Sequence, residues 1–184
     1  MEINIGLIVF AVIFIFIIWI LSYIIKTVNS LVKLRNKAVE LNSDVDVALT
    51  KRYDLLKKQY SAVKLYCSHE STTLIETIKI RSGLSGSEKS DVSGKLNTLS
   101  QQLKITMEAY PELKANEQVM LLQNSCDKAE EHLQAARRLY NTSVTNYNNM
   151  CSEVPTSIIA SLSGHKKLEY FQADAEKRND VEFT

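Results

Sequence analysis

Proline and glycine are scarce in this chain, which holds two prolines and five glycines among its 184 residues. Turns between strands and long loops draw heavily on both residue types, so their scarcity argues against a β-rich domain and favours long helices. Basic and acidic side chains nearly balance, with 22 Lys and Arg against 21 Asp and Glu. Because no basic field results, the composition argues against nucleic acid as a partner.

Cysteine is also rare, and its three copies are Cys67, Cys126 and Cys151. An odd number cannot all pair, and each cysteine falls among the apolar positions of a helical pattern. We therefore favour buried or half-buried free thiols in a reducing compartment over a disulfide or metal framework.

Motifs that carry enzymatic chemistry are missing too. The sequence has no H-E-x-x-H, G-x-x-x-x-G-K-[ST], G-x-S-x-G or C-x-x-C pattern. Its histidines stand as His69-Glu70, Glu131-His132 and an isolated His165, without the Glu-x-x-His spacing of a carboxylate-bridged metal bundle. We predict no catalytic, cofactor-binding or metal-binding residue, no cofactor and no enzymatic activity.

The chain does contain an uncharged apolar run from Ile5 to Ile25. As a helix with a rise of about 1.5 Å per residue, this run spans the roughly 30 Å hydrocarbon core of a bilayer. A cleaved signal peptide would instead have a basic start, an apolar core of about 7–15 residues and a small-residue cleavage site. We expect an uncleaved anchor over residues 1–25, with Trp19 and Tyr23 at the headgroup layer.

Four basic residues, Lys26, Lys33, Arg35 and Lys37, follow the apolar run, whereas Glu2 is the charged side chain before it. By the positive-inside rule, this asymmetry places the N-terminus outside and the remaining chain in the cytoplasm. The lipid bilayer is thus a predicted partner, and the basic residues offer a modest contact to anionic headgroups.

Residues 26–81 lack proline and glycine and repeat apolar residues at steps of three and four, which predicts a long helix. Asn42 begins a short polar run that can cap a new helix, so the pattern leaves open whether this helix is continuous. Gly83–Ser90 is expected to form a loop, and a second helix to run from Asp91 to Pro111. The stripe predicted on the first helix is Leu31, Leu34, Ala38, Leu41, Val45 and Ala48, continued less regularly by Leu55, Ala62, Tyr66, Leu74 and Ile78.

A third helix is expected from an N-cap at Asn116 to Pro155, because apolar residues follow a strict seven-residue repeat there. Such a repeat demands a left-handed packing seam against other helices. The predicted seam residues are Leu122, Ala129, Leu133, Ala136, Tyr140 and Tyr147. A short turn over residues 156–162 is expected to be helical before Ser163-Gly164 releases the tail.

Arg137 and Arg138, beside Tyr140 and Asn141, raise the idea of a phosphate clamp. Residues this close in sequence occupy different faces of a helix, so not all of them can converge. We favour arginine stems that cover apolar surface and pair with carboxylates.

The tail, residues 163–184, is highly charged yet carries Tyr170, Phe171, Val181 and Phe183. Exposed aromatic rings gain nothing in water, and this spacing fits an extended segment better than a helix face. We predict that these residues dock in a groove of their own bundle or of a neighbouring copy. A disordered tail with incidental apolar residues is the alternative.

These patterns together predict an all-α chain with three parts. A single transmembrane helix covers residues 1–25, a long antiparallel bundle of three to four helices covers residues 26–162, and an extended tail covers residues 163–184.

Several blocks of residues match a known pattern. They are Asn29-Ser30-Leu31-Val32, Asp44-Val45-Asp46-Val47, Arg52-Tyr53-Asp54-Leu55, Tyr110-Pro111-Glu112-Leu113-Lys114-Ala115-Asn116-Glu117, Ala136-Arg137-Arg138-Leu139-Tyr140-Asn141 and Tyr147-Asn148. In these blocks the chain resembles the LemA family of bacterial membrane-anchored proteins. It departs from the family at Leu56-Lys57-Lys58, where Pro-Asn is usual and a kink is expected to be straightened. It also departs at Asn42, where tryptophan is usual.

The resemblance implies an extracellular N-terminus, a single span of the bacterial inner membrane and a cytoplasmic antiparallel helical bundle, but no settled activity. The first hypothesis is a non-enzymatic scaffold that assembles with itself as a homo-oligomer. The alternative is an adaptor or regulator of a membrane protease or envelope-stress system, with another membrane protein as partner.

Overall fold

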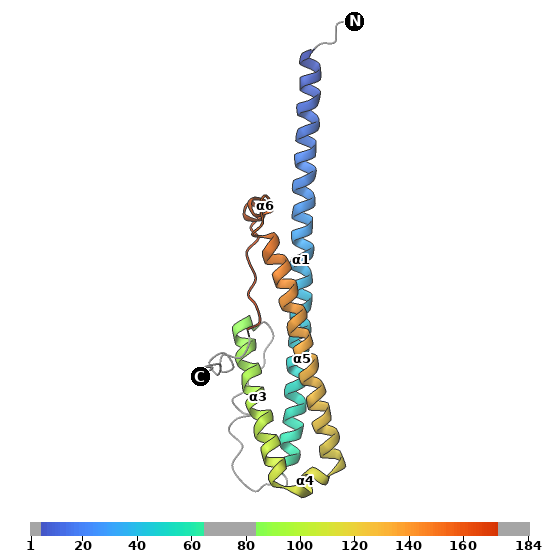
Figure 1. Ribbon diagram of the computed structural model, residues 1–184, viewed down its shortest axis with the longest axis vertical. Coiled ribbons are helices and arrows are strands. Elements are labelled where there is room, and N and C mark those ends of the chain that lie inside the picture. Colours follow the sequence, from blue (N-terminus) through green and yellow to red (C-terminus); the bar gives the residue numbers. More distant parts are fainter. Residues whose placement is uncertain (1–4, 65–83, 173–184) are drawn as a thin grey trace, which may run out of the picture. The chain divides into compact units, whose positions relative to one another are not determined.

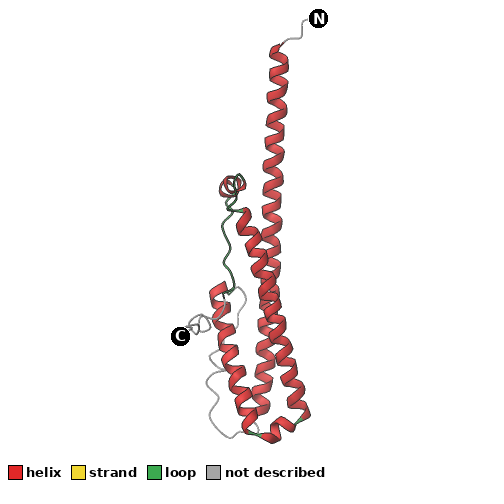
Figure 2. Ribbon diagram, viewed as in Figure 1, coloured by secondary structure: helices red, strands yellow, loops and turns green. Residues whose placement is uncertain are grey.

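The computed structural model describes residues 5–64 and 84–172, and every regular element within these ranges is a helix (Figures 1 and 2). The helices are α1 (Ile5–Lys64), α3 (Gly86–Ala109), α4 (Pro111–Ala115), α5 (Glu117–Met150) and α6 (Thr156–Leu162). The prediction of an all-α chain with a long apolar N-terminal helix is therefore confirmed for these residues.

The described residues divide into two compact units. The first holds residues 5–39 and 143–168, and the second holds residues 40–64, 84–142 and 169–172. The predicted division into anchor, bundle and tail stays a prediction.

Helix α1 runs through Asn42 without a break, which settles the alternative that the sequence left open. Neither proline nor glycine interrupts it beyond Gly6, and the Asn42 side chain bonds to Lys89 rather than capping a new helix. The helix also continues through Leu56-Lys57-Lys58, in agreement with the expected loss of a family kink.

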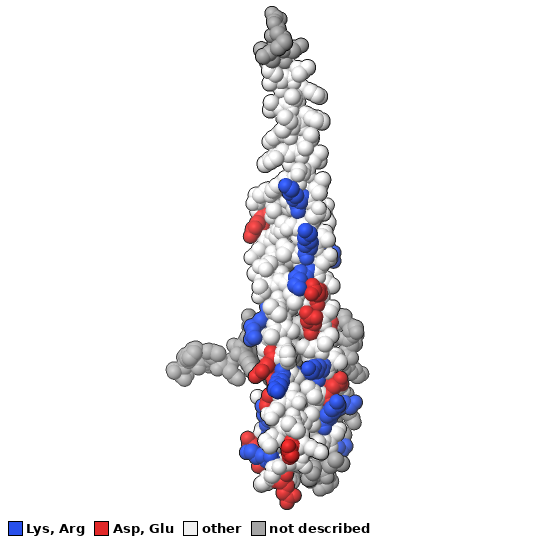
Figure 3. Space-filling model, turned by 90° about the vertical axis from the view of Figure 1, so that its right-hand side faces the viewer, with Lys and Arg blue, Asp and Glu red and all other residues white. Residues whose placement is uncertain are grey.

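The N-terminal part of α1 exposes its apolar side chains on all sides. Trp19 is 64% exposed, and its ring stacks against Phe16 and Tyr23 with centroids 6.0 and 6.4 Å apart. Ile25, at the end of this part, is also exposed, and Ile5 is the first residue of the helix. Figure 3 shows no charged side chain over this segment. Within the described ranges, α1 is the one helix long and apolar enough to cross a membrane.

The predicted loop over Gly83–Ser90 is wrong in its second half, because α3 already begins at Gly86. Ser85 is the N-cap of α3. Its hydroxyl accepts from the Glu88 backbone N–H, and the Glu88 carboxylate accepts from the Ser85 N–H at 2.8 Å. This reciprocal capping box satisfies two backbone donors, and it outweighs the loop-like composition of the segment.

The ends of the later helices follow local signals. Helix α3 ends before Pro111, as expected, and Pro111 opens the short helix α4, which the sequence pattern did not predict. Asn116 caps α5, because its side-chain oxygen accepts from two backbone N–H groups of the first turn. Helix α5 ends at Met150 and not near Pro155. The Thr156 hydroxyl donates to the Met150 carbonyl oxygen at 2.7 Å, which satisfies an acceptor at the helix end. The expected helical turn over residues 156–162 is confirmed as α6.

Helix directions in the second unit follow from paired contacts between α1, α3 and α5 (Figure 1). From α1 to α3, the contacts pair Asn42 with Lys89, Arg52 with Asn97 and Gln59 with Met107, so both sets of numbers rise. From α1 to α5, Arg52 pairs with Glu130 and Gln59 with Gln123, so the residue numbers on α5 fall as those on α1 rise. Helix α5 therefore runs opposite to α1 and α3.

Candidate functional site

Three polar levels lie inside the second unit, and the first is built on Lys89 of α3. Its side chain is 1% exposed, and its ammonium lies 2.7 Å from the Asp46 carboxylate and 2.6 Å from the Asn42 side-chain oxygen. The Asn42 backbone carbonyl accepts at 3.3 Å. These three acceptors match the three donors of an ammonium group, so the buried charge is compensated.

The second level is built on Arg52 of α1, which is 3% exposed. Its guanidinium lies 2.7 Å from the Asn97 amide oxygen on α3 and 2.7 Å from the Glu130 carboxylate on α5. One side chain thus joins three helices.

The third level is built on Gln59 of α1, whose amide donates to the Met107 sulfur at 3.3 Å and to the Gln123 side chain. Gln123 donates in turn to Asp127, which also accepts from Lys104 at 3.0 Å. Partial burial works to raise the pKa of Asp127, but the hydrogen bonds from Gln123 and Lys104 outweigh burial and hold that pKa below its ordinary value.

The buried charges and amides of the three levels are directed at one another. Each level pairs side chains from neighbouring helices, so its interactions help to fix the register between those helices.

Sequence reasoning missed the interior positions of Arg52 and Gln59. Steps of seven from Leu31 lead through Ala38 and Val45 to Arg52 and then to Gln59, and all five residues are buried. Beyond Val45 the predicted stripe followed other positions. Its residues Ala48, Leu55 and Ala62 are only half-buried. The buried apolar residues in that part of the helix are Leu49, Leu56, Tyr60 and Val63. The heptad count was the signal that could have found these positions.

The Cys126 thiol is buried and unreactive. Burial, with the neighbouring Asp127 charge, raises the pKa of the Cys126 thiol to about 11. A thiol held protonated is a poor nucleophile. Cys126 and Cys151 are free, as expected, and Cys67 lies outside the described residues.

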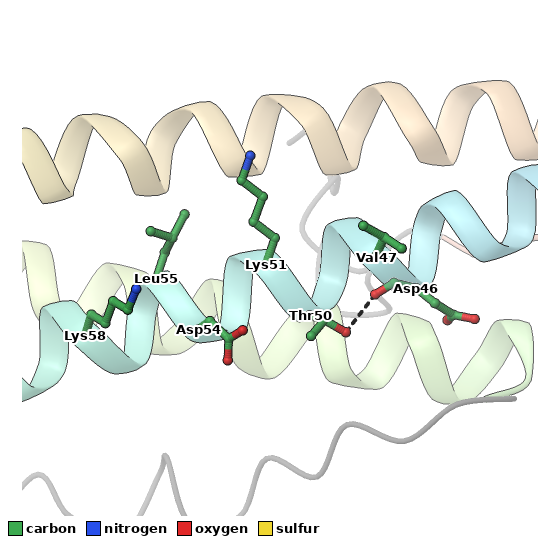
Figure 4. Close-up of a pocket in the computed structure, with 7 residues that line it drawn as sticks. All are labelled: Asp46, Val47, Thr50, Lys51, Asp54, Leu55 and Lys58. Carbon is green, nitrogen blue, oxygen red and sulfur yellow. Dashed lines mark hydrogen bonds between the residues drawn. The ribbon is translucent and has the colours of Figure 1, made fainter.

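A shallow hollow on α1 has polar walls but no converging set of groups. It is lined by Asp46, Val47, Thr50, Lys51, Asp54, Leu55 and Lys58, all from this one helix (Figure 4). The Thr50 hydroxyl is turned back onto the Asp46 carbonyl at 2.8 Å. The described lining residues come from one face of α1, and they form no converging set of polar groups.

Metal ligands do not gather among residues 5–64 and 84–172, where no three His, Cys, Asp or Glu side chains form a group able to hold an ion. His132 is exposed, and His165 contacts the Tyr147 hydroxyl at 3.1 Å. His69-Glu70 lies outside the described residues.

The most developed site in the second unit is a clasp formed by Ser90 of α3 with Arg137, Tyr140 and Asn141 of α5. It holds residues 169–172, which we call the clasped segment. The Asn141 amide donates to the Phe171 carbonyl at 2.8 Å and accepts from the Phe171 N–H at 2.9 Å. These two hydrogen bonds satisfy both backbone polar groups of Phe171.

The other members of the clasp also bond to backbone. The Tyr140 hydroxyl donates to the Glu169 carbonyl at 2.8 Å. Arg137 and Ser90 both donate to the Gln172 carbonyl at 3.0 Å. Burial, followed by the nearby Glu169 and Asp46 charges, raises the pKa of Tyr140, so its hydroxyl stays a donor at neutral pH.

The clasped segment approaches α3 closely at Gly86. A Cβ placed there would lie 2.5 Å from the Tyr170 carbonyl oxygen, well inside van der Waals contact. A glycine at this position therefore makes room for the segment.

Phe171 is the apolar anchor of the clasped segment and is 2% exposed, whereas Tyr170 is 42% exposed. The Arg137 guanidinium lies 4.3 Å from the centroid of the Phe171 ring. Arg137 thus covers an apolar ring, as favoured over the phosphate clamp, while Arg138 is exposed. Val181 and Phe183, the other predicted docking residues, lie outside the described residues.

The first unit contains a similar bond. Asn148 donates to the Leu168 carbonyl at 2.9 Å and accepts from the Leu168 N–H at 2.8 Å. Leu168 packs against the cluster of Leu31, Tyr147 and Ala160. Burial, together with the neighbouring Cys151, raises the pKa of Tyr147 to about 12.

The predicted seam of α5 is buried at most of its positions. Ala129, Leu133, Tyr140 and Tyr147 are buried, whereas Leu122 and Ala136 are half-buried. The close-packed small residue of this helix is therefore Ala129, which is 2% exposed.

Comparison with known proteins identifies a family. A sequence model of the LemA family matches residues 41–184, and no curated protein matches the chain.

Proposed function

The chain belongs to the LemA family, and from this premise we propose that it is a membrane-anchored scaffold without enzymatic activity, which assembles with copies of itself. The observation that carries the proposal is the N-terminal part of α1, where about 20 consecutive apolar residues are exposed on every side. Such a surface is stable in a lipid bilayer and not in water.

An uncleaved anchor is supported by the continuity of α1. The apolar residues and the polar residues that enter the second unit lie on the same helix, Ile5–Lys64. A signal peptidase requires an accessible small-residue site, and no such site follows Ile25.

A cytoplasmic location for the rest of the chain is the second part of the proposal. Four basic residues follow Ile25 within about three helical turns, the region where basic residues set orientation. They are Lys26, Lys33, Arg35 and Lys37. With this orientation the chain is a single-pass protein of the bacterial inner membrane, with its N-terminus outside.

The body is proposed to form an antiparallel bundle of three to four helices followed by an extended tail. The opposed directions of α1 and α5 support this arrangement. The three polar levels support a structural role, because their side chains pair across neighbouring helices and the described residues among them form no acid–base or nucleophile pair.

The experiment that tests the function is the native mass of the full chain, extracted in mild detergent and measured by light scattering coupled to size exclusion. A homogeneous assembly made of this chain alone supports the scaffold. Co-purification with one stoichiometric membrane protein supports the adaptor alternative. A monomer without a partner contradicts both.

A further inference from the structure

The clasp recognises its segment almost entirely through the main chain. Tyr140, Asn141, Arg137 and Ser90 form the five hydrogen bonds described above, and each one ends on a backbone atom of the clasped segment. Backbone-directed bonds of this kind bind an extended peptide regardless of most of its side chains, as in strand-addition complexes.

One side chain adds selectivity to the clasp. Phe171 is 2% exposed, and its ring lies beneath the Arg137 guanidinium. Tyr170 and Gln172 on either side of it are exposed, so Phe171 is the buried side chain of the segment. The ligand that fits the clasp is therefore an extended peptide with one buried aromatic residue between exposed neighbours.

We propose that the clasp is a peptide-binding groove that exchanges its own segment for residues 169–172 of a second copy, so that copies link through swapped segments. This inference rests on the proposed self-assembly and gives it a mechanism. Every copy carries a segment that fits the groove by identity, and the bonds made within one chain and between two chains are the same.

The chain leading to the segment allows a change of path. Gly164, in the left-handed region at φ 73°, follows α6 and is exposed. A glycine adopts other backbone angles without a steric penalty, so the residues beyond it can leave in another direction. Leu168 then releases its two bonds to Asn148 and forms the same two bonds to Asn148 of the second copy. Anchoring in a membrane also raises the concentration of copies around one another, which favours the exchanged form.

The test is a disulfide trap between two differently tagged full-length chains expressed together. Both have their three native cysteines replaced by alanine; one carries Ser90→Cys and the other Gln172→Cys. These positions are apposed, since the Ser90 hydroxyl lies 3.0 Å from the Gln172 carbonyl oxygen. Mild oxidation in membranes should give a disulfide-linked dimer that contains both tags.

Two matched variants control the trap. Adding Asn141→Ala to the Ser90→Cys chain removes two hydrogen bonds of the groove and should lower the dimer yield by about tenfold or more. Moving the acceptor cysteine from Ser90 to the exposed Asn146 should give no dimer. The helical circular dichroism of the Asn141→Ala chain shows that it remains folded, and Tyr140→Phe serves as the milder variant if it does not.

The outcomes separate this inference from the scaffold on which it rests. If one chain carrying both Ser90→Cys and Gln172→Cys closes on itself, and the two-tag dimer is absent, exchange is wrong. If the native mass still shows an assembly in that case, the scaffold survives. A dimer that is insensitive to Asn141→Ala also overturns the exchange, because it arises elsewhere than in the clasp.

Discussion

Arg52 and Gln59 occupy positions where a packed helix ordinarily carries leucine or alanine. Arg52 donates to Asn97 on α3 and forms an ion pair with Glu130 on α5, and Gln59 donates to Met107 on α3 and to Gln123 on α5. A shift of either helix by one turn would break these pairs. Polar residues at such positions fix register and partner choice at a cost in stability, which suits a chain that must not pair at random.

Removal of the Arg52 side chain tests this assignment. We expect Arg52→Leu to lower the free energy of unfolding by about 2–4 kcal/mol, because Asn97 and the half-buried Glu130 lose their contacts with the guanidinium. Lys95→Leu is the control, since Lys95 is exposed and its pair with Asp91 within α3 contributes less than about 1 kcal/mol. Thermal unfolding followed by circular dichroism in detergent measures both, and equal shifts would contradict the assignment.

Cys126 gives a second prediction at the same scale. The raised pKa of about 11 means that the folded state holds the thiol proton more tightly than the unfolded state, whose value is 9.0. The stabilisation is complete below pH 9 and is lost as pH rises from 9 to about 11. Compared with Cys126→Ala, the native chain should therefore lose more stability across this window. Parallel pH profiles of the two proteins would contradict the assignment.

Helix ends show how far local signals reach. Pro111, Asn116 and the turn over residues 156–162 were placed correctly, because each depends on neighbours within a few residues. The start of α3 was missed because Gly86 and its serine neighbours have a composition typical of loops. The spacing of Ser85 and Glu88 nevertheless matches a capping box.

Contacts between distant residues were not predictable in the same way. Asn141 and Phe171 were both singled out from the sequence, but in separate hypotheses, since nothing local says that a side chain will bond to backbone 30 residues later. The buried ion partners of Lys89 are equally remote, because Asn42 and Asp46 lie on another helix.

Packing along α5 is tested with its small residue. We expect Ala129→Phe to cost roughly 1–3 kcal/mol, because Ala129 is 2% exposed and an added ring must displace its neighbours. The same change at the half-buried Ala136 should cost less. Denaturant unfolding of both variants gives the comparison, and a larger loss at Ala136 would reverse this view of the seam.

At the scale of the whole molecule, the charge asymmetry around the apolar part of α1 predicts orientation in the membrane. Basic residues follow Ile25 closely, so the body should stay on the cytoplasmic side. In a cysteine-free background, an impermeant thiol reagent applied to intact cells should label Asn4→Cys. It should leave Lys128→Cys, an exposed position of α5, unlabelled until the cells are permeabilised. Labelling of Lys128→Cys in intact cells would place the body outside, and the cytoplasmic scaffold would then be wrong.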